Sequence, residues 1–140
     1  MTKAELRKIY LEKRLSLSEQ DYTELNKRLC QNFFSDIDLS STKILHTFLP
    51  IEKSKEPDTR LIIDGIRSGC PDIRISIPRM KDKTEELEHI YFDNPAQLKV
   101  HKWGIPQPHE GKLTPIEEID VVLVPLLIFD KQGNRVGYGK

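Results

Sequence analysis

The chain has 140 residues, enough for a single domain over residues 1–140 with one hydrophobic core. Its 22 basic and 22 acidic residues give a formal net charge of 0, which offers no support for nucleic-acid binding, because that class usually carries a basic excess. No stretch approaches the roughly 20 apolar residues of a membrane span, and the two cysteines are isolated. We therefore expect a soluble cytoplasmic monomer that binds neither nucleic acid nor a membrane.

Two amphipathic helices are predicted at the N-terminus. Thr2 and Glu5 have the spacing of a capping box, and the helix that follows is expected to end near Leu15. Residues 18–21 form a second start signal. Apolar side chains then recur at steps of three and four, as a second helix requires: Tyr22, Leu25, Leu29 and Phe33.

The first helix carries a basic edge. At about 100° per residue, Lys3, Arg7 and Arg14 fall within roughly 40° of one another. Such a stripe is commonly a solvated helix face. It is also suited to clamping a polyphosphate, because guanidinium forks and an ammonium point charge both match phosphate oxygens. The sequence leaves both interpretations open.

The middle of the chain alternates between strands and helices. Expected in order are a strand over 43–49, a polar loop over 50–58, a helix capped by Asp58 or Thr59 that ends near Gly69, and a strand over 73–77 that ends at Pro78. A weaker strand over 87–92, a short helix starting at Asn94-Pro95, a rigid loop over 104–108 and a helical turn capped at Thr114 follow.

Residues 121–129 are apolar throughout, as expected of a central strand covered on both faces, although Pro125 suggests a bulge or a local break. The alternation of elements predicts an α/β fold with a mainly parallel sheet and flanking helices.

The C-terminal segment 129–140 is rich in glycine and basic residues. Gly133, Gly137 and Gly139 would let backbone N–H groups approach an anion, with Arg135 and Lys140 beside them. The plainer alternative is a glycine-rich turn, and the pattern is not a P-loop.

Two further residues are candidates for binding a flat, amino-bearing ligand. Trp103, beside prolines, can wall an aromatic ring or can simply be a core or rim residue. Glu56 can accept hydrogen bonds from an amino-heterocycle or can be a solvated loop residue. The four histidines do not form a metal set, so we expect no metal ligands.

Four runs together resemble one enzyme family. The most specific is DVVLVPLLIFDKQGNRVGYGK over 120–140, which is similar to the strand and FDxxGxRxGxGKG loop of the 5-formyltetrahydrofolate cyclo-ligases, also called methenyltetrahydrofolate synthetases. KAELR over 3–7, IPRM over 77–80 and WGIPQP over 103–108 match in the same order. The resemblance implies the fold that this family shares with sugar-phosphate isomerases and coenzyme A transferases.

The resemblance also implies a reaction. ATP phosphorylates the formyl oxygen of 5-formyltetrahydrofolate, N10 attacks the activated carbon, and 5,10-methenyltetrahydrofolate, ADP and phosphate are released, with Mg²⁺ accompanying ATP. The folate partner can carry one or several glutamates.

Site residues follow from the same resemblance. The expected ATP contacts are Lys3, Arg7, Arg14, Arg135, Gly137, Tyr138, Gly139 and Lys140. Lys140 and Arg135 are expected to act catalytically by neutralising charge on the transferring phosphoryl group. The expected substrate contacts are Leu49, Ile51, Glu56, Trp103 and Tyr138.

The family loop continues into a GYYD-like stretch whose Asp helps to hold Mg²⁺, and then into further strands and helices. From this we expect a C-terminally truncated cyclo-ligase domain that ends inside its phosphate loop at Lys140. One alternative is a fragment that binds nucleotide and folate without turnover. Another is a phosphosugar isomerase-like enzyme on the same fold that needs no ATP, although no acid–base pair for the sugar carbons stands out.

Overall fold

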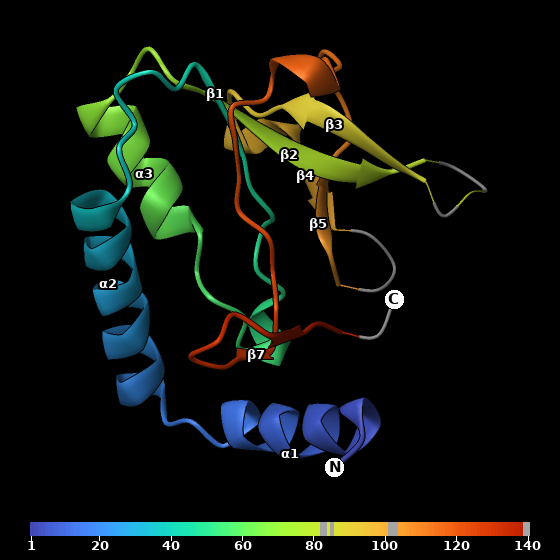
Figure 1. The fold of residues 1–140 in the computed structure, drawn as a ribbon. Helices are drawn as coiled ribbons and strands as arrows, with labels where there is room; N and C mark the ends of the chain where they lie inside the picture. The colour runs from blue at the N-terminus through green and yellow to red at the C-terminus, as the bar shows by residue number, and fades with distance from the viewer. Residues whose placement is uncertain (82–83, 85, 101–103, 139–140) are drawn as a thin grey trace.

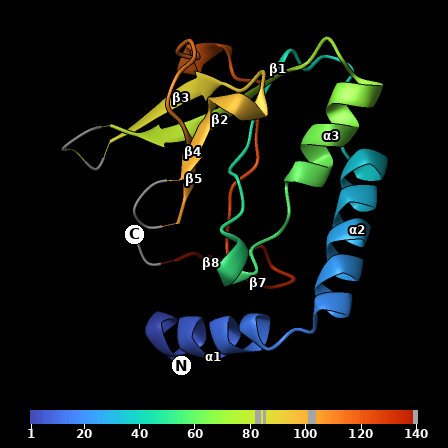
Figure 2. The same ribbon diagram turned by 180° about the vertical axis from the view of Figure 1, so that it is seen from behind.

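The computed structural model describes residues 1–81, 84, 86–100 and 104–138. Its helices are α1 (Lys3–Leu15), α2 (Glu19–Asp36) and α3 (Arg60–Gly69), with short 3-10 turns η1 (Glu52–Ser54), η2 (Pro95–Gln97) and η3 (Ile116–Glu118). Its strands are β1 (Ile44–His46), β2 (Arg74–Met80), β3 (Leu87–Tyr91), β4 (Leu98–Val100), β5 (Pro106–Pro108), β6 (Val121–Val122), β7 (Ile128–Phe129) and β8 (Arg135–Val136). Figures 1 and 2 show the chain from opposite sides.

The central sheet has the strand order β3-β2-β1-β6. β1 runs parallel to both β2 and β6, whereas β3 runs antiparallel to β2. Two small hairpins, β4–β5 and β7–β8, stand outside this sheet. The prediction of an α/β fold with a mainly parallel sheet is confirmed.

The core lies between α3 and the sheet. α2 packs on α3 along one side of the sheet, and α1 crosses the end where β7 lies (Figures 1 and 2). The central buried side chains are Leu45, Ile62, Ile63, Ile66, Ile75 and Ile77. Each contributes about 1.5–3 kcal/mol through burial, so this layer holds β1 and β2 in register beneath α3.

The two N-terminal helices begin as predicted. The Thr2 hydroxyl accepts the Glu5 N–H at 3.2 Å, and the Glu5 carboxylate accepts the Thr2 N–H at 2.6 Å, which completes the capping box. The Ser18 hydroxyl accepts the Asp21 N–H at 3.1 Å. Both starts depend on side chains within three residues, and such local signals are legible in a sequence.

Of the two residues predicted to cap α3, Asp58 binds a first-turn N–H and Thr59 does not. Thr59 occupies the cap position without capping, because its hydroxyl donates to the Phe48 carbonyl at 2.6 Å. The Asp58 carboxylate instead accepts the Arg60 N–H at 3.2 Å. Thr59 thereby links the segment that follows β1 to the start of α3. The helix ends at Gly69, as expected.

Two predicted strand ends were wrong. The strand predicted over 43–49 is shorter, because β1 has only three residues, Ile44–His46. β2 does not end at Pro78 but continues to Met80. Its pairing with β1 stops at Ser76, so Pro78 has a described neighbour only in β3, and its missing N–H does not interrupt a ladder on the β1 side.

The region after β3 also differs in part from the sequence prediction. The predicted short helix is present as η2, capped by Asn94. The prediction of a rigid loop over 104–108 is wrong in part, because residues 106–108 form strand β5 and pair with β4. The turn η3 forms, but Thr114 does not cap it: its hydroxyl lies 2.7 Å from that of Ser76 in the buried interior.

The predicted central strand over 121–129 is wrong. Only Val121–Val122 pair with β1, and β6 is an edge strand of the sheet as described. The chain then leaves the sheet and forms β7 in a separate hairpin, so the break suggested by Pro125 is confirmed. Val122 is 54% exposed and Phe129 75%, so these residues are not covered on both faces.

Candidate functional site

The basic edge of α1 faces the C-terminal segment. Arg7 Nε donates to the Gly137 carbonyl at 3.0 Å. Arg14 Nη1 donates to the Tyr138 hydroxyl at 2.7 Å, and its guanidinium lies 5.3 Å from the centre of that ring. The fold therefore joins two of the three predicted basic residues to two predicted nucleotide-binding residues that are more than 120 positions away in the chain.

The third basic residue, Lys3, lines a cavity of about 790 Å³ between α1 and the β7–β8 hairpin. Arg135 of β8 lines the same cavity. Arg14 Nε is shielded from solvent and has no hydrogen-bond partner among the residues that the structure describes. Arg14 lies in the last turn of α1 and does not line this cavity. Since buried donors normally have an acceptor, its Nε is available to a ligand group.

The hairpin turn beside this cavity is closed by Asp130. The Asn134 side-chain amide donates to Asp130 Oδ2 at 2.9 Å, and Asp130 Oδ1 accepts the N–H groups of Asn134 and Gln132, each at 2.9 Å. The Asn134 amide, followed by these backbone N–H groups, holds the pKa of Asp130 below its ordinary value. Gly133 has φ +87°, which favours glycine. These amides already bind the protein's own carboxylate, so the part of the predicted anion nest around Gly133 is a capped turn instead.

Glu56 is buried, with 8% of its surface exposed. Its Oε2 accepts the Ile51 N–H at 2.8 Å. Burial raises the pKa of the Glu56 carboxyl, while the Ile51 N–H and the charge of Arg14 act in the opposite direction. Of the two readings that the sequence left open, the solvated loop residue is therefore wrong.

Helix α2 fixes the backbone around Glu56. The Tyr22 hydroxyl donates to the Glu56 carbonyl at 2.5 Å, and Asn26 Oδ1 accepts the Asp58 N–H at 2.9 Å. Lys55 adopts a left-handed conformation, φ +48°, and its ammonium donates to the Leu17 carbonyl. Sequence reasoning missed this support, because Tyr22 was assigned only to the apolar helix face and Asn26 carried no pattern.

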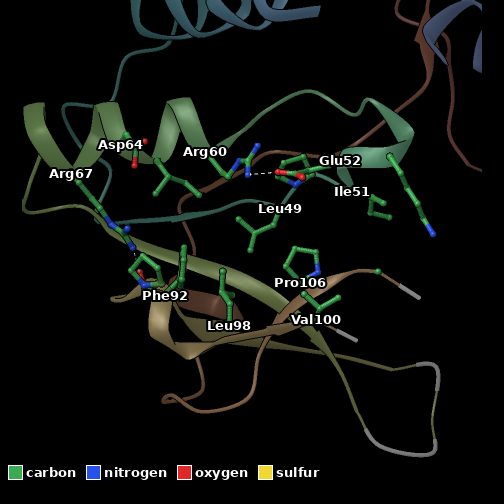
Figure 3. A pocket seen from close by; sticks show the side chains of 15 residues that line it. Leu49, Ile51, Glu52, Arg60, Asp64, Arg67, Phe92, Leu98, Val100 and Pro106 are labelled. Atoms are coloured by element: carbon green, nitrogen blue, oxygen red, sulfur yellow. Dashed lines mark hydrogen bonds and ion pairs between the residues drawn. The ribbon is translucent and has the colours of Figure 1, made fainter. Parts of the chain in front are cut away.

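Leu49 and Ile51 line a second cavity, of about 570 Å³, between η1, α3 and the β4–β5 hairpin (Figure 3). The Ile51 end of this cavity lies beside Glu56, through the hydrogen bond just described. Its floor is apolar and includes Leu98 and Phe92. Two predicted substrate contacts thus line one cavity, and Glu56 bonds to one of them without lining the cavity itself. Arg67 at the other end was not anticipated.

A buried histidine pair was also missed. His46 Nε2 lies 2.9 Å from His89 Nδ1, and the two rings meet edge to face. Burial, with a smaller effect of His89, lowers the pKa of His46 to about 4. The two residues are 43 positions apart, so only the pairing of β3 with β2 beside β1 reveals their contact.

Residues 1–140 match the family model of the 5-formyltetrahydrofolate cyclo-ligase family over their whole length. The chain belongs to this family.

Individual relatives agree with the assignment. A mouse 5-formyltetrahydrofolate cyclo-ligase is 26% identical over 136 residues, which cover 89% of this chain and 63% of the mouse protein. A 5-formyltetrahydrofolate cyclo-ligase of Haemophilus influenzae is 39% identical over 44 residues, 30% of this chain and 24% of that protein. The chain therefore spans less than two thirds of the length of these relatives.

Solved structures show the same fold. The 5,10-methenyltetrahydrofolate synthetase of Aquifex aeolicus superposes with a TM-score of 0.82 at 31% identity, over 100% of this chain and 69% of that one. A synthetase from Mycoplasma pneumoniae gives a TM-score of 0.71 at 24% identity, over 99% of this chain and 73% of that one, and supports the fold alone. The predicted family resemblance is confirmed.

Three of the predicted site residues are not among those that the structure describes. Trp103, Gly139 and Lys140 lie outside the described residues. Within the described ranges there is no cluster of three or more His, Cys, Asp or Glu side chains that could hold a metal ion. Among the helices in these ranges, none is long and apolar enough to cross a membrane.

Proposed function

We propose that the chain acts in the ATP-dependent cyclisation of 5-formyltetrahydrofolate to 5,10-methenyltetrahydrofolate, with release of ADP and phosphate. The observation that supports this most is the contact of the basic edge of α1 with the segment 135–138, next to the cavity that Lys3 and Arg135 line. In this proposal the protein is cytoplasmic and its partner is a reduced folate.

The nucleotide would be held by residues from both ends of the chain. Bound ATP would supply the phosphoryl group that activates the formyl oxygen. Lys3, Arg7, Arg14 and Arg135 would neutralise its phosphates, with Gly137 and Tyr138 from the adjoining backbone, and Gly139 and Lys140 would follow. Lys3 and Arg135 fit this role, because both line the cavity and neither forms an ion pair with a described residue. Arg14 Nε, which has no described partner, would be available beside Tyr138. Mg²⁺ would be held mainly by the phosphate oxygens.

The folate would lie in the second cavity. Its pterin head would be placed at the Ile51 end. Glu56 does not itself line the cavity but bonds to the Ile51 N–H, and in this proposal its carboxylate would accept hydrogen bonds from ring N–H groups. Only the Ile51 N–H among described donors bonds to the Glu56 carboxylate, so acceptor capacity remains on its oxygens. Leu49 would pack against the flat ring, and Trp103 and Tyr138 would be further contacts. Holding both reactants in fixed orientation is the main contribution that a protein makes to such a transfer.

The test is to mix the purified chain with 5-formyltetrahydrofolate, Mg²⁺ and ATP and to follow the near-ultraviolet absorbance of the methenyl product. We expect growth of this band that requires ATP. A chain of intact mass that gives no band, but still binds both ligands, would contradict turnover and support binding without catalysis. Isomerisation of a sugar phosphate without ATP, and no methenyl band, would instead support the phosphosugar isomerase-like alternative.

A further inference from the structure

The cavity between α3 and the β4–β5 hairpin has two chemically different ends (Figure 3). At one end Ile51 is hydrogen-bonded to the buried Glu56. At the other end lie Arg67 of α3 and Phe92, which follows β3. Between the two ends Leu49 and Leu98 form an apolar floor, while Arg60 and Asp64 of α3 line the cavity on the helix side. The cavity therefore fits an elongated ligand that packs on the apolar floor and carries an anionic group at the Arg67 end.

Arg67 carries a charge that the described residues do not neutralise. Its Nη2 donates to the Phe92 carbonyl at 2.8 Å, and its guanidinium lies 4.8 Å from the centre of the Phe92 ring. No described carboxylate forms an ion pair with it. A half-buried guanidinium that is held in place by stacking and by one neutral acceptor keeps further N–H donors for a carboxylate.

The other cations that line the cavity are less suited to this task. Arg60 Nη1 bonds to Glu52 at 2.7 Å and its Nε to Asp58 at 2.8 Å, so its charge is already compensated. Lys53 is exposed and belongs to η1, beside the Ile51 end. Asp64, one turn before Arg67, is exposed, and water and salt screen its repulsion of an anion.

We infer that Arg67 binds a carboxylate of the glutamate tail of the folate and makes the site selective for glutamate-bearing folates. This inference rests on the proposed function, since it takes the folate head to lie at Glu56. The p-aminobenzoyl ring would cross the apolar floor, and the tail would leave the cavity past Phe92. Arg67 is in this view a specificity-determining residue, remote from the atoms that react.

The experiment compares two ligands by calorimetric titration: 5-formyltetrahydrofolate and 5-formyltetrahydropteroate, which lacks the glutamate. The wild type is expected to bind the first about tenfold more tightly, the size of one hydrogen bond to a charged group near the surface. Arg67→Ala should remove this preference and leave the affinity for the pteroate unchanged. Arg67→Lys should keep part of it.

The matched control is Arg74→Ala. Arg74 also stacks on an aromatic ring, 3.6 Å from the centre of Tyr91, and pairs with Asp93, but it does not line the cavity. It should keep the full preference. If Arg67→Ala does not fold, a reduced preference in a folded Arg67→Lys still supports the inference. Equal binding of the two ligands by the wild type, or an undiminished preference in the Arg67 variants, would overturn it. If neither ligand binds, the proposed function fails as well.

Discussion

At the scale of single residues, Glu56 shows how burial changes the role of a loop carboxylate. Its Oε2 takes a backbone N–H, and its backbone is held by α2, so the side chain cannot turn freely to solvent. A Glu56→Gln variant keeps the size and an acceptor for the Ile51 N–H but removes the negative charge. We expect it to bind 5-formyltetrahydrofolate about tenfold more weakly in a titration, because a charge-assisted hydrogen bond is lost. Unchanged affinity would show that Glu56 does not bind the pterin.

The same substitution predicts a pH effect on stability. Burial raises the pKa of Glu56 above its ordinary 4.5, so its contribution is complete below the unfolded value and is lost as pH rises through the folded value. The free energy of unfolding, measured with denaturant, should therefore fall less with rising pH for Glu56→Gln than for the wild type. A steeper fall in the variant would show that the carboxyl is stabilised by its surroundings in the charged form.

His46 has the opposite dependence. Folding lowers its pKa from 6.5 to about 4, so the stability that it contributes is present above pH 6.5 and is lost as pH falls toward 4. The loss should reach roughly 2 kcal/mol, allowing for solvent that still reaches the ring. His46→Gln, which can keep a hydrogen bond to His89, should show a flatter acid limb in unfolding measurements between these values. An identical acid limb would assign the loss to other groups.

At the scale of elements, α3 is the helix on which the sheet depends. Ile66 is fully buried on its inner face, whereas Leu61 is 38% exposed on its outer face. Ile66→Ala should lower the free energy of unfolding by about 2–5 kcal/mol, through lost burial and a residual cavity. Leu61→Ala, the control on the same helix, should cost about 1 kcal/mol or less. Equal effects of the two variants would contradict the packing described here.

The edge strand β6 is tied to β1 by Asp120. Its Oδ2 accepts the N–H groups of Lys43 at 2.8 Å and Ile44 at 3.0 Å, and these bonds lower the pKa of the carboxyl. Asp120→Ala should therefore lower the melting temperature by a few degrees at neutral pH. The difference from the wild type should shrink in acid, as the wild-type carboxyl is protonated. A constant difference across pH would point to packing in place of these two bonds.

The elements also show what the sequence could reveal. Helices α1 and α2 were predicted with their caps, since a cap and a helical repeat are local signals. The segment 121–129 was misjudged because its apolar composition fits either a covered strand or two short exposed ones, and only the strand order places β6 at an edge. Composition does not encode that order. Glu56 was a candidate from its residue type and loop position, and Leu49 was named through the family resemblance. Arg67, Tyr22 and His46 depend on contacts between distant segments.

At the scale of the whole molecule, the fold brings the two ends of the chain together. α1 packs beside the β7–β8 hairpin, and Arg7 and Arg14 contact Gly137 and Tyr138 across the entire sequence. A nucleotide bound there would link both ends, while the folate cavity lies between η1, α3 and the β4–β5 hairpin. The account thus assigns the two proposed substrates to separate cavities, with Arg14 close enough to Glu56 for its charge to affect that carboxyl.

The measurement that tests this account most directly is a calorimetric titration of the wild type, Arg7→Ala and Arg28→Ala with ATP and Mg²⁺. Arg28 lies on the exposed surface of α2 and serves as the matched control. We expect the wild type and Arg28→Ala to bind equally, and Arg7→Ala to bind at least about tenfold more weakly, because a charge-assisted phosphate contact is removed. Absence of ATP binding by the wild type, or equal binding by all three proteins, would contradict a nucleotide site on the basic edge of α1.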